Sequence, residues 1–336
     1  MKVSDLHYEY PQELVATEPR RPSRVLWVEK QTPSEMTLSE LLARIPEGDA
    51  LVINDTKVLK RRVFAGDLEI LFLANRGNRL WEVLFPSRKF SVGEVVNLPE
   101  GIKMELIQKG RPQVVRVDRD LDEAWFQRAA ELPLPPYIQK AREQRHSLPA
   151  DERWYQTAWA EKPGSFASPT ASLHFSADDI RSLKDRGVEI VPITLHIGLG
   201  TFLPVQAEDL DQHEMHEEWV EVSAESWRRL LAVRDRGGHV WSLGTTSTRA
   251  IESVANGLLP GTEEGGFSGF TRLMIQPGYK WKIVDRLLTN FHQPESTLLA
   301  LVASFCDLTT VKMCYQWAIE RRFRLFSYGD LSVWIK

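Results

Sequence analysis

The stretch VEIVPITLHI, residues 188–197, limits how this chain can fold. Every second residue from 191 to 197 is apolar, whereas Thr194 and His196 occupy the alternate positions. Successive side chains of a strand point to opposite faces. The pattern therefore predicts a strand that buries one face and turns His196 away from its most apolar side.

Strand and helix signals alternate on either side of this strand. Ser176, with Asp179 three residues on, predicts the start of a helix, and Gly187 its end. Later helices are predicted over 223–237, about 247–256, from about 294 and over 309–322, and strands over 239–243, 285–291 and 331–335. This alternation is typical of an α/β sheet domain.

Residues 63–117 follow a different pattern, with short alternating runs separated by turn residues. The runs 68–73 and 80–85 flank NRGN, and the runs 104–108 and 114–117 flank KGRP, so each pair predicts a β-hairpin. Strands this short with no helix between them favour a small antiparallel barrel or sandwich.

The two patterns, and a length of 336 residues, predict two domains. The fold class that we expect is α/β, with a mixed-sheet domain formed by residues 1–62 and 151–336. A small antiparallel β-barrel domain is inserted at 63–150, and its return linker includes LPLPPYI, residues 132–138.

Composition excludes several classes of protein. A net charge of −4 argues against nucleic-acid binding through the overall field, although local basic clusters remain open. The longest apolar run, 298–305, is far shorter than the roughly 20 residues of a membrane span, and early acidic residues argue against a signal peptide. We therefore expect a cytoplasmic protein that is not associated with a membrane. Cys306 and Cys314 both fall in apolar helical sequence, which argues against a disulfide framework.

Four stretches predict a small-molecule site. GSFASPTASLHF (164–175) and ITLHIGLGTFLPV (193–205) place hydroxyls and histidines among small residues, which lets a ligand approach the backbone. LGTTSTR (243–249) predicts a helix N-terminus suited to a carboxylate or phosphate. TNFHQPESTLL (289–299) places polar side chains at a strand end, where α/β proteins bind ligands.

Two motifs resemble known ligand-binding patterns but do not match their spacing. HEMHEE, residues 213–218, has its histidines three apart rather than the four of a zinc-binding HExxH, so we expect no metal. GLG, residues 198–200, lacks the third glycine of a dinucleotide fingerprint and opens no clear helix.

Together with SRVL (23–26), INDTKV (53–58), LFPSRK (84–89) and FSYGD (326–330), these motifs give the chain its family resemblance. It resembles S-adenosylmethionine:tRNA ribosyltransferase-isomerases of queuosine biosynthesis over essentially its whole length. The resemblance implies transfer and isomerisation of the ribosyl group of S-adenosylmethionine onto 7-aminomethyl-7-deazaguanine at the tRNA wobble position. The products are epoxyqueuosine, adenine and methionine. The implied partners are S-adenosylmethionine and a tRNA with a queuosine-type anticodon, while the oligomeric state stays open.

This chemistry needs a base, a proton donor for adenine and groups that hold the sugar. We predict His196 and His292 as catalytic residues, with His174 in reserve. The predicted substrate-binding residues are Ser165, Thr170, Thr194, Gly198, Gly200, Thr201, Phe202, His216, Glu218, Thr245, Thr246, Arg249, Asn290, Ser296, Thr297, Tyr328 and Asp330. The predicted RNA-binding residues are Lys57, Lys60, Arg61, Arg88 and Lys89.

The chain departs from the family pattern at several positions. Ser172 stands where the family has glycine, Thr248 where it has valine, and Leu331-Ser332 where it has Ala-Met. Glu217 replaces a serine, and Lys57, Lys60 and Arg61 replace parts of NNTRVIPAR. The alternatives are an S-adenosylmethionine-dependent RNA methyltransferase, a catalytically altered tRNA-binding member of the family, and a carbohydrate-binding or structural α/β protein.

Overall fold

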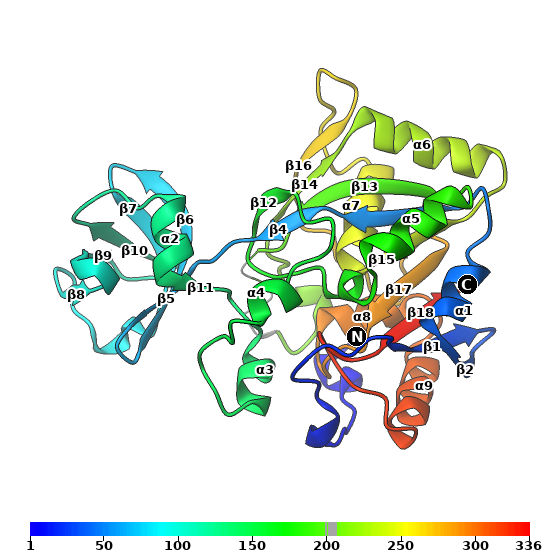
Figure 1. Ribbon diagram of the computed structural model, residues 1–336, viewed down its shortest axis with the longest axis horizontal. Helices are drawn as coiled ribbons and strands as arrows, with labels where there is room; N and C mark the ends of the chain where they lie inside the picture. Colours follow the sequence, from blue (N-terminus) through cyan, green and yellow to red (C-terminus); the bar gives the residue numbers. More distant parts are fainter. Residues whose placement is uncertain (199, 201–206) are drawn as a thin grey trace. The chain divides into compact units, whose positions relative to one another are not determined.

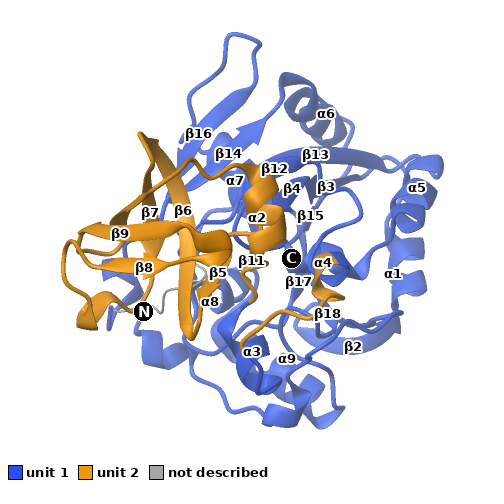
Figure 2. Ribbon diagram, turned by 60° about the vertical axis from the view of Figure 1, so that its left-hand side comes forward, with its two compact units in different colours: residues 1–58, 135–144, 153–336 blue, residues 59–134, 145–152 orange. Residues whose placement is uncertain are grey.

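The computed structural model describes residues 1–198, 200 and 207–336, which form two compact units (Figures 1 and 2). Unit 1 comprises Met1–Val58, Pro135–Gln144 and Arg153–Lys336, and unit 2 comprises Leu59–Leu134 and Arg145–Glu152. The division drawn from the sequence differs mainly at Pro135–Gln144. This segment contains helix α3 (Pro136–Ala141) and belongs to unit 1, where the ring of Tyr137 packs edge-on against Phe326.

A nine-stranded mixed sheet forms the centre of unit 1 (Figure 1). Its order is β16 (Phe267–Thr271), β14 (Glu218–Val222), β13 (Glu189–His196), β3 (Ala50–Asn54), β15 (Val240–Leu243), β17 (Arg286–Asn290), β18 (Leu331–Ile335), β1 (Arg24–Glu29) and β2 (Thr32–Thr37). The strands β13, β3, β15 and β17 run parallel to one another. The α/β architecture is therefore confirmed, as are the strands predicted over 188–197 and 331–335.

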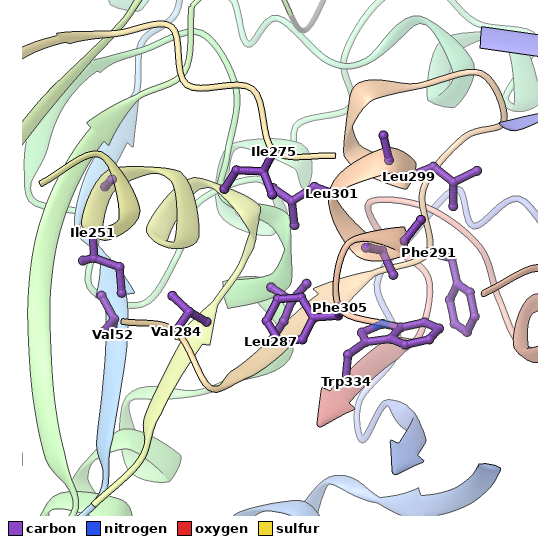
Figure 3. Close-up of a cluster of buried hydrophobic side chains, with 14 of the residues drawn as sticks. Val52, Ile251, Ile275, Val284, Leu287, Phe291, Leu299, Leu301, Phe305 and Trp334 are labelled. Carbon is purple, nitrogen blue, oxygen red and sulfur yellow. The ribbon is translucent and has the colours of Figure 1, made fainter. Parts of the chain in front are cut away.

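Both faces of this sheet are buried, because alternate residues of its strands enter separate cores. In β1, Leu26 and Val28 belong to one hydrophobic cluster, and Val25 and Trp27 belong to the other. The first cluster is covered by α6 (Ala224–Asp235), α7 (Thr245–Ala255), α8 (Thr297–Ala303) and α9 (Leu308–Glu320), and the second by α1 (Leu38–Arg44) and α5 (Ala177–Asp185). Figure 3 shows part of the first cluster, including Ile251 of α7.

Unit 2 is built on a seven-stranded antiparallel sheet. Its order is β11 (Ala130–Glu131), β5 (Arg62–Ala65), β6 (Leu68–Gly77), β7 (Leu80–Leu84), β10 (Gln113–Val117), β9 (Lys103–Gln108) and β8 (Val95–Asn97). Both predicted hairpins are confirmed as β6–β7 and β9–β10. At the first of them Asn78 and Arg79 both have positive φ, as a two-residue turn between twisted strands requires.

The expected small antiparallel barrel is not confirmed, since β11 and β8 form the two edges of the sheet. Helix α2 (Glu123–Ala129) supplies the missing cover. Its Trp125 and Phe126 pack edge-on against Phe72 of the sheet, and Phe126 also packs against Trp81. The core of unit 2 is therefore closed by a helix as well as by sheet curvature.

Several smaller elements lie outside the two large sheets. β4 (Thr56–Val58) pairs in parallel with β12 (Lys162–Ser165), α4 (Asp151–Trp154) is a single turn, and Thr170–His174 forms a 3-10 helix. Among the described residues no single helix is long and apolar enough to cross a membrane. One bent pair, α8 with α9 at 106°, meets that criterion by length and composition.

Candidate active site

A cavity of about 520 Å³ lies in unit 1 at the carboxyl ends of the parallel strands. Ile197 follows β13, Gly244 follows β15 and Asn290 ends β17, and all three residues line the cavity. Open α/β sheets bind their ligands at this edge, and sites for small molecules usually measure ~300–1,000 Å³. This cavity is therefore the candidate active site.

Asn54, the last residue of β3, fixes two walls of the cavity. Its fully buried side chain accepts the backbone amide of Leu195 at 3.0 Å and donates to the carbonyl of the same residue at 3.0 Å. It also donates to Thr246 Oγ1 at 3.3 Å. One amide side chain thus ties the start of α7 to the end of β13.

Asn290 orients a third wall. Its Nδ2 donates to the Phe326 carbonyl at 3.1 Å and to His174 Nε2 at 2.9 Å, while its Oδ1 accepts from Thr170 Oγ1 at 2.8 Å. The carbonyl contact sets which side of the amide carries the nitrogen. Asn290 therefore holds the 3-10 helix Thr170–His174 against β17.

A buried ion pair joins β14 to α7. Arg249 Nη1 donates to Glu218 Oε2, and both side chains are less than a tenth exposed. Arg249 Nε donates to the Leu273 carbonyl at 3.0 Å, and Glu218 Oε1 accepts the Gly198 amide at 3.3 Å. Both charged residues line the cavity, so they present opposite charges to a ligand from one place.

Comparisons with known proteins show which family this chain belongs to. The family model described as "Queuosine biosynthesis protein" matches residues 3–334. The chain belongs to that family. It is 38% identical over 347 residues to the S-adenosylmethionine:tRNA ribosyltransferase-isomerase of Halothermothrix orenii, with 98% of each chain covered. It is 38% identical over 351 residues to the enzyme of the same name from Acetivibrio thermocellus, again with 98% of each covered.

A solved structure agrees with this assignment. The crystal structure of S-adenosylmethionine tRNA ribosyltransferase from Thermotoga maritima matches with a TM-score of 0.56 and 28% sequence identity. The match covers 98% of this chain and 99% of that one. The similarity to the family therefore extends to the fold of the whole chain.

Many of the site residues predicted for this queuosine biosynthesis protein line the cavity. They come from five motifs, at 164–175, 193–205, 213–218, 243–249 and 289–299. The residues brought together are Thr170, Gly200, His216, Glu218, Thr245, Thr246, Arg249, Asn290, His292, Ser296 and Thr297.

Other predicted residues lie elsewhere. His196 points to the opposite face of β13 from Ile197, where its Nδ1 contacts Thr56 Oγ1 at 2.7 Å. A Cβ atom on Gly164 would lie only 2.6 Å from His196 Nε2, so the backbone of that residue covers the ring. Burial lowers the pKa of His196. The structure does not bring this histidine into the cavity.

The remaining predicted residues make structural contacts. Ser165 donates to the Ala167 carbonyl, Thr194 donates to Asp55, and Asp330 accepts the amides of Arg24 and Arg324. Gly198, Tyr328 and His174, the reserve catalytic residue, also lie outside the cavity lining. Thr201 and Phe202 fall outside the described residues.

The structure adds lining residues that the sequence prediction omitted. Tyr137 and Tyr155 contribute aromatic rings, and Ser168 contributes a hydroxyl. Tyr137 lies in LPLPPYI (132–138), which we assigned to the return linker and which is also a motif of the family, and Tyr155 lies in WYQTAW (154–159), another motif of the family. The aromatic residues in these family motifs were the available signal.

The departure at Ser172 needs no unusual backbone. Ser172 lies within the 3-10 helix Thr170–His174 and is not among the residues with positive φ. Its side chain is fully buried, and its Oγ has no hydrogen-bond partner among the described residues. A serine can therefore occupy this position without strain, although it leaves a polar atom unsatisfied.

His292 is the buried histidine of the cavity wall. Its Nε2 contacts Thr289 Oγ1 at 2.8 Å, and its backbone amide donates to the Tyr315 hydroxyl at 3.1 Å. Burial lowers the pKa of His292 to about 3, so the imidazole is neutral near pH 7. A neutral ring with one nitrogen held by Thr289 can exchange a hydrogen bond with a ligand through the other nitrogen.

The described residues contain no group of three or more His, Cys, Asp or Glu side chains that could hold a metal ion. His213 and His216 both line the cavity, and burial, followed by the charge of His216, lowers the pKa of His213.

His174 predicts a pH-dependent stability. Burial, followed by the charges of Arg21 and Arg324, lowers its pKa to about 3. Unfolding lets this ring bind a proton between about pH 3 and 6.5, so stability is lost as the pH falls through that window, by about 1.4 kcal/mol per unit. When the pH is lowered from 7 to 5, the free energy of unfolding should therefore fall in both proteins. The fall should be smaller in His174→Gln than in the parent by about 2 kcal/mol.

Urea unfolding at the two pH values measures this difference. His239→Gln, at an exposed position, is the control and should keep the parental pH dependence. Equal losses in His174→Gln and the parent would contradict the assignment.

Proposed function

We propose that this protein is an S-adenosylmethionine:tRNA ribosyltransferase-isomerase. It transfers the ribosyl group of S-adenosylmethionine to 7-aminomethyl-7-deazaguanine at the tRNA wobble position, forms epoxyqueuosine, and releases adenine and methionine. One observation carries the proposal beyond the family match. Residues from five separate motifs, including Thr170, Glu218, Arg249 and His292, line a single cavity of suitable size.

The lining suits the cationic donor substrate. A sulfonium is favoured by aromatic faces, and Tyr137, Tyr155 and Phe326 all line the cavity. Departure of adenine requires a proton donor, and rearrangement of the sugar requires removal of a proton beside the sulfonium. Among the described residues three histidines line the cavity, and two of them, His216 and His292, are the side chains we place in these proton transfers. Thr245 and Thr246 supply hydroxyls for the sugar oxygens.

Adenine release tests the function. The protein is incubated with S-adenosylmethionine and tRNA that carries 7-aminomethyl-7-deazaguanine, and the small molecules are separated by chromatography. We expect adenine and methionine to accumulate only when this tRNA is present. Formation of S-adenosylhomocysteine instead would support the methyltransferase alternative and overturn the proposal.

The predicted RNA-binding residues divide into two groups. Lys60 pairs with Glu152, while Arg61 is buried, pairs with Glu123 and stacks on Phe126. These two cations are therefore already paired with carboxylates of unit 2. Lys57, Arg88 and Lys89 are exposed. We therefore assign the phosphate contacts of unit 2 to Arg88 and Lys89, which lie in the 3-10 helix Ser87–Lys89.

Neutralising this pair should weaken tRNA binding. In Arg88→Gln/Lys89→Gln, the slope of log affinity against log salt should become shallower by about 1.4 to 1.8, since each of the two phosphate contacts contributes about 0.7–0.9. Filter binding over a salt series measures the slope. A matched exposed pair on α5, Arg181→Gln/Lys184→Gln, should leave it unchanged. An unaltered slope in the first variant would remove Arg88 and Lys89 from the interface.

A further inference from the structure

The N-terminus of α7 opens into the cavity without a side-chain cap. Gly244 occupies the N-cap position with a φ of 93°, in the left-handed region that favours glycine, and it offers no oxygen to the first amides of the helix. Gly244, Thr245 and Thr246 all line the cavity. The helix has 11 residues, long enough for a helix dipole to build up. Because its first residues line the cavity, the positive end of this dipole faces the ligand.

Two buried polar groups from residues that line the same cavity lack partners. Arg249 Nη2 and Ser168 Oγ have no hydrogen-bond partner among the described residues, although both residues line the cavity. Arg249 is 6% exposed and Ser168 is 3% exposed. Leaving such groups buried and unpaired is unfavourable, and a ligand acceptor would remove the cost.

The position of Arg249 brings its free nitrogen toward the uncapped amides. Arg249 lies four residues after Thr245, on the same face of α7, and helical side chains lean toward the N-terminus. Its Nε and Nη1 are already committed to the Leu273 carbonyl and to Glu218. The remaining Nη2, the first amides of α7 and Ser168 Oγ all belong to residues at the cavity, and we call these three donors the anion seat.

Glu218 determines which anion fits. Its carboxylate neutralises Arg249 and keeps acceptor capacity beyond its two existing hydrogen bonds. A phosphate dianion would be repelled by Glu218. An α-amino acid carries a carboxylate and an ammonium on one carbon, so each of its charges would meet an opposite charge of the buried pair.

We propose that this seat binds the α-amino-acid head of the methionyl part of S-adenosylmethionine. The carboxylate binds Arg249 Nη2, Ser168 Oγ and the first amides of α7, and the ammonium binds Glu218. This inference rests on the proposed function, and it fixes which end of the donor enters this part of the cavity. The ribose and adenine then occupy the rest of the cavity.

Calorimetry on the unmodified protein tests the seat. Its ligands are S-adenosylmethionine, its decarboxylated analogue and the analogue whose amino group is replaced by hydroxyl. Loss of the carboxylate should weaken binding by about 10- to 100-fold, as expected for hydrogen bonds to a charged group, and loss of the ammonium by about 10-fold. Equal affinities within threefold would overturn the seat. If adenine is still released, the proposed function survives that result, whereas failure of S-adenosylmethionine itself to bind would overturn both.

A pair of serine variants provides the matched control. Ser168→Ala should weaken S-adenosylmethionine about 5- to 10-fold but leave the decarboxylated analogue unchanged, because only the carboxylate uses Oγ. Ser172→Ala removes another buried, unpartnered hydroxyl that does not line the cavity, and should change neither affinity. Equal weakening of both ligands in Ser168→Ala, or of neither, would contradict the proposal. The proposal would also be contradicted if inorganic phosphate displaced S-adenosylmethionine as effectively as methionine does.

Discussion

Replacing His292 with glutamine is expected to lower turnover by about 10²- to 10⁴-fold while S-adenosylmethionine affinity changes by less than about threefold. His292 lines the cavity, and burial lowers its pKa to about 3, so the parent presents a neutral imidazole at pH 7. Glutamine keeps a polar side chain at this position but cannot transfer a proton as imidazole does. Adenine release under saturating substrates, together with calorimetry, separates the two effects.

His196→Gln is the matched control for this experiment. His196 contacts Thr56, and its ring lies under the backbone of Gly164 outside the cavity lining. Its replacement should reduce turnover by less than about tenfold, through an altered strand end alone. If His196→Gln were the more damaging change, with both variants folded, the cavity would not contain the reacting group.

The second large effect concerns the ion pair of Glu218 and Arg249. Arg249→Met should lower the free energy of unfolding by about 3–5 kcal/mol, because it leaves the Glu218 carboxylate buried without its partner. It should also abolish measurable binding of S-adenosylmethionine. Urea unfolding gives the first quantity and calorimetry the second.

The pair can be separated from its individual charges by a double variant. Glu218→Met/Arg249→Met removes both buried charges and should recover part of the lost stability without recovering binding. Arg181→Met, which breaks an exposed pair with Asp178 on α5, should cost less than about 1 kcal/mol. A loss below about 1 kcal/mol in Arg249→Met would show that the buried pair does not stabilise the fold.

Regular apolar patterns allowed several strands of the large sheet to be predicted. One hairpin of this sheet was not predicted, because its turn has unusual residues. β13 and β18 follow from apolar runs with clear bounds. The β1–β2 hairpin was missed because its turn residues, Lys30 and Gln31, both adopt positive φ, where Asn and Gly are the usual signal. The small antiparallel barrel expected at residues 63–150 is not confirmed, for a related reason. Sequence periodicity predicts strands but does not reveal that α2 covers their apolar face.

The site was predictable only as far as the motifs themselves. Strand alternation correctly separated His196 from Ile197, yet it could not tell which face of β13 the cavity occupies. The polar face of β13 lies against β4 and β12, which sequence separation concealed. Arg249 and Glu218 were placed at the site by family resemblance, but their ion pair depends on the pairing of distant elements.

The most direct test of the central claim follows the ribose carbons of the donor. S-adenosylmethionine labelled with ¹³C in its ribose is incubated with the protein and tRNA bearing 7-aminomethyl-7-deazaguanine, and the tRNA is digested to nucleosides for mass spectrometry. The account predicts that the five labelled carbons appear in an epoxyqueuosine nucleoside while unlabelled adenine is released. Recovery of the label in S-adenosylhomocysteine would contradict the account. So would recovery of all the label in unreacted S-adenosylmethionine, provided that the tRNA carries the 7-aminomethyl-7-deazaguanine base.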